Sequence, residues 1–306
     1  MITGSPTFPL VSRRRLHGLA FGAMHGARRG TGSDVSGSRM YVPGDDPDRI
    51  DWGSSARLSA ALGSDEFIVR EHFADEAPRA VAVIDRSAAM SLPASGLPWV
   101  DKAAAGRIAT DIIAASVSEA RGLIGFLEFA AGRATVAWAQ PTSSGDAALE
   151  EHELPRAAGA EPQADAAGAL DFLGLHRRAV PSASFVFVLS DFLVPPSVEA
   201  WEDALDRGWD VVPVVIQDPV WEQSFPQIDG IVVPLASVDG RTRLVRLRTG
   251  ESAAWRHAHE ERRLRLLADL DGLGIEPVLI SSSALDDVFE SFASWSTERQ
   301  SAWSRA

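Results

Sequence analysis

The chain has 306 residues, of which 45% are hydrophobic and 23% charged, a composition typical of one large globular domain with room for a small companion. It contains no cysteine, which excludes disulfides, thiol nucleophiles and cysteine-ligated metal centres and is compatible with a cytoplasmic protein. The formal net charge of −13 disfavours non-specific binding to nucleic acid. No stretch approaches the roughly 20 apolar residues of a membrane helix, so we expect no integral membrane segment.

The N-terminal part of the chain differs from the rest in charge. Residues 1–40 are rich in Gly, Ser and Arg with little periodicity, which predicts a flexible basic arm. This arm either lies on the acidic body of the chain or contacts an acidic partner or a membrane surface. Residues 41–78 form a second segment, in which Asp46 is expected to cap a short helix with Pro47 at its first position.

The second segment contains a run of acidic residues, from Asp45 to Asp51. Its spacing does not match an EF-hand calcium loop, which needs alternating acids, a central glycine and a distal glutamate. We therefore expect a turn held by Asp–Arg pairs, with Arg49 and Arg57 as candidate partners. We expect Trp52, which follows directly, to pack in the core.

From residue 79 onward, short apolar runs alternate with helical patterns. The expected buried strands are Ala80–Ile84, Leu123–Phe129, Ser184–Leu189, Val211–Ile216 and Gly274–Ile280. The expected helices are Val100–Arg121, Ala166–Leu175, Val198–Asp206, Glu251–Asp271 and Leu285–Trp295. This alternation predicts an α/β fold with a mostly parallel sheet covered by helices on both faces.

One stretch breaks the alternation. Asp239-Gly240 lies between two short apolar runs, which is a strong signal for a β-hairpin near residues 231–247. We place this hairpin as an insertion at the edge of the sheet. The predicted main domain then spans residues 79–306.

Two aspartates directly follow buried strands of the predicted sheet. Asp85 follows Ala80–Ile84, and Asp191 follows Phe185–Ser190. If the two strands are neighbours, these carboxylates face one another at the carboxyl edge of the sheet, with Ser87 between them. Such an oxygen cluster suits a hard cation such as Mg²⁺. The alternative is that both aspartates cap the helices that follow and accept hydrogen bonds from loop amides.

The sequence around these positions resembles a bacterial family, domain-of-unknown-function family 58, whose members are similar to von Willebrand factor A domains. The similar segments are Tyr41–Trp52, Ala56-Arg57, Phe67–Glu71, Asp85–Ser87 and Gly274–Val278, within residues 25–295. The resemblance implies a Rossmann-like, von Willebrand factor A-type sheet and a role in protein interaction. It also implies a partner, a MoxR-type AAA+ ATPase.

The metal site implied by that resemblance is incomplete here. A metal-ion-dependent adhesion site reads Asp-x-Ser-x-Ser, followed by a distant threonine and a final aspartate. Asp85, Ser87 and Asp191 match three of these positions. Ala89 replaces the second serine, and no threonine lies within Glu161–Asp165, where one is expected. Because Mg²⁺ needs near-octahedral oxygen coordination, we expect a degenerate site that binds Mg²⁺ or Ca²⁺ weakly at most, and no cofactor.

The catalytic motifs of several enzyme classes are missing. The sequence has no Gly-x-x-x-x-Gly-Lys, Gly-x-Ser-x-Gly or His-Glu-x-x-His motif, which argues against a P-loop ATPase, a serine hydrolase and a zinc protease. The leading interpretation is a non-catalytic adaptor, with Phe192, Leu193 and Val194 as apolar anchors in a surface loop. Alternatively, Phe192 folds under and covers the core. The competing interpretation is a metal-dependent phosphoesterase or nuclease that uses Asp85 and Asp191.

Overall fold

The computed structural model describes residues 5–12, 20–42, 45–91, 100–130, 137–143, 165–236 and 242–303. Its centre is a six-stranded sheet in the order β10-β7-β6-β3-β4-β5, in which β5 is antiparallel to β4 and the other pairs are parallel. The strands are β3 (Arg79–Asp85), β4 (Leu123–Phe129), β5 (Ala137–Thr142), β6 (Phe185–Ser190), β7 (Asp210–Ile216) and β10 (Val278–Ile280). The predicted fold class is confirmed, and this arrangement is consistent with a Rossmann-like, von Willebrand factor A-type fold.

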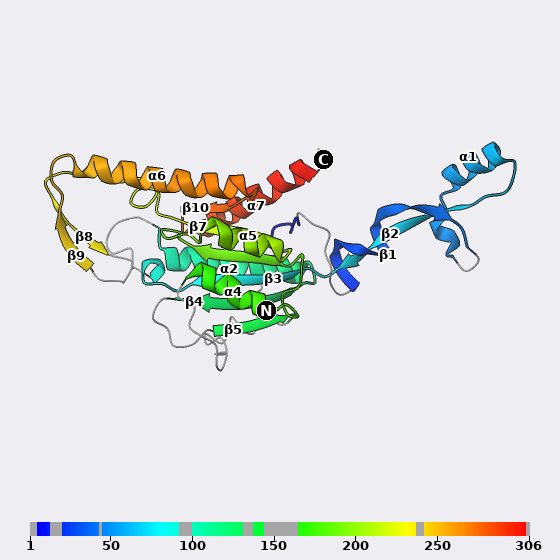
Figure 1. Ribbon diagram of the computed structural model, residues 1–306, viewed down its shortest axis with the longest axis horizontal. Coiled ribbons are helices and arrows are strands. Elements are labelled where there is room, and N and C mark those ends of the chain that lie inside the picture. The colour runs from blue at the N-terminus through cyan, green and yellow to red at the C-terminus, as the bar shows by residue number, and fades with distance from the viewer. Residues whose placement is uncertain are drawn as a thin grey trace.

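Helices cover both faces of this sheet (Figure 1). The helices are α2 (Lys102–Glu119), α4 (Ala166–Leu175), α5 (Val198–Asp206), α6 (Glu251–Gly272) and α7 (Leu285–Trp303). α2 and α7 pack on the face that carries Ala82 of β3, and α4, α5 and α6 pack on the face that carries Val83. β3 lies in the middle of the sheet and is buried on both faces, as its continuous apolar run predicts.

The first described residues are bound to the main domain, which corrects the prediction of a flexible arm for this part of the chain. Phe8 is buried, and its ring stacks on that of Phe292 in α7 with 4.9 Å between centroids. Its backbone N–H donates to Ser116 Oγ of α2 at 3.0 Å. Ser296 Oγ of α7 donates to the carbonyl of Pro9 at 2.6 Å. Burial of Phe8 between two helices removes its apolar surface from water, and this burial stabilises the contact between the segment and the main domain.

Residues 20–40 also differ from the expected flexible arm. They form β1 (Ala20–Met40), which pairs antiparallel with β2 (Ile68–Glu76). Several register shifts interrupt the pairing. Strand pairing uses backbone groups that any residue supplies, and bulges absorb the extra residues, so a Gly- and Ser-rich sequence without apolar periodicity still forms this ribbon.

The far end of the ribbon carries η1 (Pro47–Arg49) and α1 (Trp52–Leu62), and we call β1, η1, α1 and β2 together the N-terminal module. As predicted, Asp46 caps η1 by accepting from the backbone N–H of Asp48 at 3.1 Å, with Pro47 at the first position. α1 ends at Gly63, whose φ of 69° is a conformation that glycine adopts without steric cost. The module projects from the amino end of β3, away from the main domain (Figure 1).

Asp–Arg pairs hold the acidic run as expected, although the partners differ. Arg39 donates to both carboxylate oxygens of Asp45, at 2.6 and 2.7 Å, and this pairing lowers the pKa of Asp45 to about 2. Asp51 caps α1 through the backbone N–H of Ser54 and pairs with Arg70 at 3.0 Å; these bonds lower its pKa to about 2.

Of the two predicted partners of the acidic run, Arg57 was wrong, and Arg49 stays a prediction. Arg57 instead donates to the carbonyl of Gly53 on its own helix, and the side chain of Arg49 lies outside the described residues. The paired arginines stand on β1 and β2, and only the pairing of the two strands brings them to the acidic run.

The predicted hairpin is present as β8 (Val232–Ala236) and β9 (Thr242–Arg246), but its expected place at the sheet edge is wrong. It forms a two-stranded sheet of its own, beyond the carboxyl end of β7 (Figure 1). At its base, buried Leu247 packs with Phe225 in a separate small cluster that Trp255 of α6 borders. The apolar residues of the hairpin's base are thus covered by α6 and the preceding loop rather than by a strand.

Candidate functional site

The carboxyl edge of the sheet brings Asp85 and Asp191 together, as the sequence predicts for neighbouring strands. β3 and β6 pair directly, with Ile84 opposite Leu189, and both aspartates are buried. Ser190 links them, because its Oγ donates to Asp85 Oδ2 at 2.7 Å while Asp191 follows it in the chain.

The two aspartates accept hydrogen bonds from loop amides, as the alternative interpretation expects. Asp85 Oδ1 accepts the backbone N–H of Ser87 at 2.7 Å, and Asp191 Oδ1 accepts that of Leu193 at 3.1 Å. Neither caps a following helix, because Asp101 caps α2 and Ser197 caps α5. The carboxylates therefore fix the turns that leave β3 and β6.

A residue that the sequence analysis did not select completes the site. Lys102, the first residue of α2, is buried, and its Nζ donates to Asp191 Oδ2 at 2.8 Å and to Glu222 Oε1 at 2.5 Å. A signal was present in the sequence, because Lys102 is the only lysine among 29 basic residues. Sequence alone does not show its carboxylate partners, since Asp191 is 89 and Glu222 is 120 residues away.

The loop after β7 closes the site from the other side. Gln217 Nε2 donates to the carbonyl of Asp191 at 2.7 Å, and the backbone N–H of Asp218 donates to Glu222 Oε2 at 2.9 Å. Asp218 Oδ2 accepts the backbone N–H of Val100, just before α2, at 3.0 Å. Side-chain hydrogen bonds thus link the loop after β6, the loop after β7 and the start of α2, in addition to packing.

Burial dominates the electrostatics of the site. Burial raises the pKa of Asp85, and the hydrogen bonds from Ser190 and Ser87 offset only part of this effect. Burial by itself would lower the pKa of Lys102, but the carboxylates of Asp191 and Glu222 outweigh it and hold that pKa above its usual value. Burial also raises the pKa of Glu222, although Lys102 opposes the shift.

We expect Asp85→Asn to remove part of the pH dependence of stability. Because the pKa of Asp85 is raised in the folded state, the native protein takes up a proton at a higher pH than the unfolded chain. Wild type should therefore gain free energy of unfolding relative to the variant as pH falls from neutral through that pKa. Urea unfolding of both proteins over a pH series measures this difference, and parallel curves would contradict the prediction.

The donor set of the site does not fit a metal ion. Ala89 is buried beside the edge and offers no ligand atom. Lys102 occupies Asp191 Oδ2, and Ser190 occupies Asp85 Oδ2. Among the residues described, no group of three or more His, Asp or Glu side chains is placed to hold a metal.

The region expected to supply the threonine ligand is described only at its last residue. Asp165 accepts the backbone N–H of Gly168 at 2.8 Å as the cap of α4, and the rest of Glu161–Asp165 lies outside the described residues. The prediction that Asp85, Ser87 and Asp191 bind Mg²⁺ or Ca²⁺ weakly at most can be tested by calorimetry.

Phe192 is not a surface anchor, which corrects the predicted partner-binding set. Its side chain is 1% exposed and packs on Trp201 of α5, with 6.0 Å between ring centroids. Its φ of 48° turns the chain so that the ring points into the core, a conformation that costs a non-glycine residue about 1–2 kcal/mol. Of the three predicted anchors, Leu193 is half-buried and Val194 is 69% exposed.

Comparison with known families identifies the chain. A profile described as "Protein of unknown function DUF58" matches residues 37–265, three quarters of the sequence. The chain belongs to the DUF58 family. The match covers the acidic run of the N-terminal module, the carboxyl-edge residues and the hairpin, and it is shorter at both ends than the resemblance over residues 25–295.

Proteins from two mycobacterial species are similar to most of the chain. Uncharacterised proteins of Mycobacterium tuberculosis and Mycobacterium bovis are 27% identical to the chain over 233 residues, which cover 74% of this chain and 68% of theirs.

Two solved structures are distantly similar. The conserved hypothetical protein BatB from Bacteroides thetaiotaomicron is 17% identical, with a TM-score of 0.37 over 72% of this chain and 99% of its own. An aerotolerance-related membrane protein from Bacteroides fragilis is 15% identical, with a TM-score of 0.34 over 61% and 99% of the two chains. Within the described part of this DUF58 chain, no helix could span a membrane, because none combines the necessary length and hydropathy.

The N-terminal module presents a group of aromatic side chains at its surface, which we call the aromatic patch: half-buried Tyr41 and exposed Trp52 and Phe67. Trp52 and Phe67 are 63% and 39% exposed, and their rings meet edge to face at 5.9 Å; Tyr41 meets Phe67 at 6.3 Å. The prediction that Trp52 packs in the core was wrong, because no described helix or strand covers the outer side of α1. Met40 and Val42 extend the exposed apolar surface.

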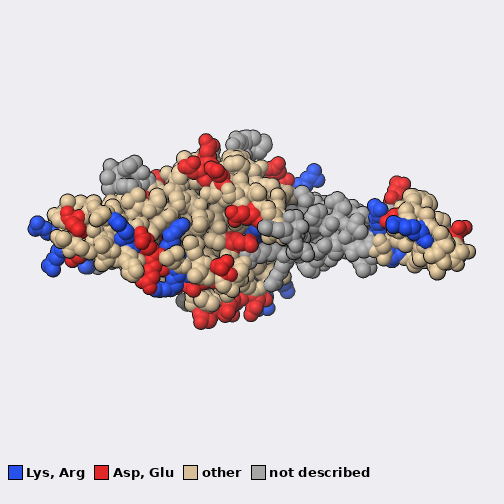
Figure 2. All heavy atoms as spheres, turned by 90° about the horizontal axis from the view of Figure 1, so that it is seen from above, with Lys and Arg blue, Asp and Glu red and all other residues tan. Residues whose placement is uncertain are grey.

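The module that carries this patch has charged residues of both signs at its surface. Arg39, Arg57 and Arg70 are exposed on it, as are Asp46 and Asp48, and Figure 2 shows basic and acidic atoms side by side there. Arg39 and Arg70 pair with acids of the module, so their charge is partly compensated.

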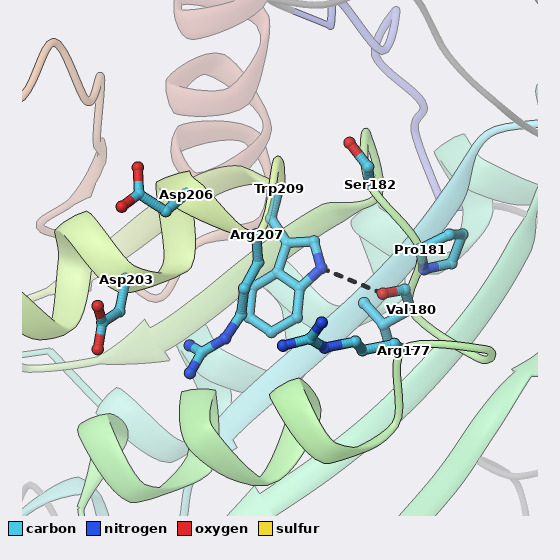
Figure 3. A pocket seen from close by; sticks show the side chains of 8 residues that line it. All are labelled: Arg177, Val180, Pro181, Ser182, Asp203, Asp206, Arg207 and Trp209. Carbon is cyan, nitrogen blue, oxygen red and sulfur yellow. Dashed lines mark hydrogen bonds between the residues drawn. The ribbon is translucent and has the colours of Figure 1, made fainter.

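A surface pocket of about 570 Å³ lies at the opposite, amino edge of the sheet (Figure 3). Arg177 and Arg207 point into the same space beside Trp209, whose indole N–H donates to the carbonyl of Val180 at 3.2 Å. The lining of the pocket also includes the acidic residues Asp203 and Asp206, and Arg207 pairs with Asp171 outside the pocket. Ligands of open parallel sheets bind at the carboxyl edge, so this pocket is the weaker candidate site.

Proposed function

We propose that this DUF58 protein is a non-catalytic adaptor that binds a MoxR-type AAA+ ATPase through the aromatic patch, in the cytoplasm. The observation that supports this proposal most strongly is the exposure of Trp52 and Phe67 side by side on a projecting module. Two large aromatic rings left in water on one small surface are typical of a binding site, since aromatic side chains dominate interface energies. The identity of the partner comes from the family resemblance.

The carboxyl edge supports an adaptor better than a hydrolase. Metal-dependent phosphoesterases and nucleases use carboxylates that are free to hold two ions. Here Asp85 and Asp191 are occupied by Ser190, backbone amides and Lys102. These contacts give both acids a structural role.

The composition of the patch defines the surface that would complement it. Its apolar rings need an apolar cavity or groove on the ATPase, and the exposed arginines and aspartates of the module favour residues of opposite charge at the rim of that groove. Rim charges act mainly on the association rate, so binding is expected to be faster at low salt. Exposed Val194 at the carboxyl edge is the alternative contact surface, because it is the one fully exposed member of the set predicted from the sequence.

The test is the affinity of wild type and variants for the MoxR-type ATPase of the same organism, with and without ATP and Mg²⁺. Trp52→Ala should weaken binding by at least about tenfold, the effect of a hot-spot aromatic residue. Leu264→Ala is the matched control, because Leu264 on α6 is similarly exposed, at 67%, and lies outside the patch. Circular dichroism checks that each variant is folded.

Three outcomes distinguish the possibilities. Loss of binding in Trp52→Ala but not in Leu264→Ala supports the proposal. No binding by wild type under any nucleotide condition removes the ATPase as partner. Full binding by Trp52→Ala together with loss in Val194→Ser moves the interface to the carboxyl edge.

A further inference from the structure

We propose that Lys102 is a built-in cation, which does at the carboxyl edge what a bound metal ion would otherwise do. The edge gathers three acidic side chains, Asp85, Asp191 and Glu222, and a buried carboxylate is unfavourable unless a positive charge or hydrogen-bond donors compensate it. Lys102 supplies both, with one positive charge and three N–H donors on a single atom.

The geometry of the ammonium group supports this role. Nζ lies 2.8 Å from Asp191 Oδ2 and 2.5 Å from Glu222 Oε1, and the Lys102 side chain is 7% exposed. An Mg²⁺ ion at its usual distance of about 2.1 Å from the same Asp191 oxygen would lie within a few ångströms of the buried ammonium. The two cations would repel each other in a region of low dielectric constant, so the lysine and a metal exclude one another.

Lys102 lies at a position in its helix that is unfavourable for a positive charge, so its carboxylate partners must stabilise it there. It is the first residue of α2, directly after the cap Asp101, where the helix dipole disfavours a positive charge. The carboxylates of Asp191 and Glu222 overcome this effect, and their pairing joins α2 to the loops that follow β6 and β7. The arrangement of the carboxyl edge is therefore set by covalently attached groups and does not depend on divalent cations.

The experiment compares the melting temperatures of wild type and Lys102→Ala with MgCl₂ or with EDTA. Wild type should melt at the same temperature in both. Lys102→Ala should melt lower in EDTA and regain several degrees in MgCl₂, because removing the ammonium leaves two carboxylates free to bind the ion. Lys102→Ala combined with Asp191→Asn is the control and should not respond. Stabilisation of wild type by MgCl₂, or no response of folded Lys102→Ala, would overturn the proposal.

A second measurement on wild type decides the matter even if the variant does not fold. Because Lys102 is the only lysine, lysine labelled with ¹⁵N at Nζ gives one side-chain ammonium signal. This signal should be protected from exchange and unchanged by MgCl₂. A signal that moves on addition of MgCl₂, or that exchanges like a free amine, would show that Lys102 does not hold the site, and the proposal would fail. The result is independent of whether the chain binds an ATPase.

Discussion

Arg299→Met is expected to lower the free energy of unfolding by about 3–5 kcal/mol, the usual cost of removing one member of a buried ion pair. Arg299 of α7 and Asp210 of β7 are both buried, and Nη1 donates to both oxygens of Asp210 at 3.1 Å. Nε donates to Glu276 at 2.6 Å, and Nη1 also donates to the carbonyl of Val11 at 3.0 Å. Methionine fills a similar volume but removes the buried guanidinium from Asp210 and Glu276.

The measurement is urea unfolding at neutral pH, with Arg265→Met as the matched control. Arg265 pairs with Glu261 on the surface of α6, both side chains being more than half exposed, so its replacement should change stability by less than about 1 kcal/mol. Arg299→Met combined with Asp210→Asn should recover part of the loss, because the second substitution removes the buried negative charge that Arg299 compensates. A loss in Arg299→Met no larger than in the control would contradict this account.

Lys102→Met should also cost about 3–5 kcal/mol at neutral pH, because it leaves Asp191 and Glu222 without their shared cation. The triple variant Lys102→Met, Asp191→Asn, Glu222→Gln should recover most of this loss. Its amide oxygens can still accept the backbone N–H groups of Leu193 and Asp218, so only the charge is removed.

The loss in free energy of unfolding caused by Lys102→Met should become smaller as pH falls. Burial already raises the pKa of Glu222, and removing Lys102 removes the main group that opposes the shift. The folded variant then takes up a proton at a higher pH than its unfolded chain, so its stability rises as pH falls through that raised pKa. Unfolding curves at neutral and mildly acidic pH test this, and a loss that is constant or grows at lower pH would rule out unpaired carboxylates as its cause.

Together, these two clusters show how the helices are held to the sheet at its two ends. Lys102 joins α2 to the carboxyl edge, and Arg299 joins α7 to Asp210 at the start of β7. Packing by itself tolerates small shifts of a helix along a sheet, whereas a buried ion pair has a narrow distance range. The hypothesis that these pairs fix the positions of α2 and α7 can be tested by hydrogen exchange in the same variants.

The apolar runs of the sequence are enough to predict the main sheet. Residues buried on both faces must be apolar throughout, so runs such as Ala80–Ile84 and Phe185–Leu189 identify central strands without knowledge of their neighbours. The alternation of these runs with amphipathic helices then leaves few arrangements other than a parallel sheet. The placement of Asp85 and Asp191 at one edge followed from the same reasoning.

The groups that surround these acids, and the apolar residues that are exposed, depend on contacts between distant segments of the chain. Lys102 meets Asp191 and Glu222 across long sequence separations, and nothing local to any of them encodes that contact. Phe192 was predicted at the surface and is buried, whereas Trp52 was predicted in the core and is exposed. Burial depends on whether another element covers the residue, and α5 covers Phe192 while nothing described covers Trp52. Local sequence fixes periodicity and capping, which are short-range, whereas charge pairing and exposure depend on where distant segments meet.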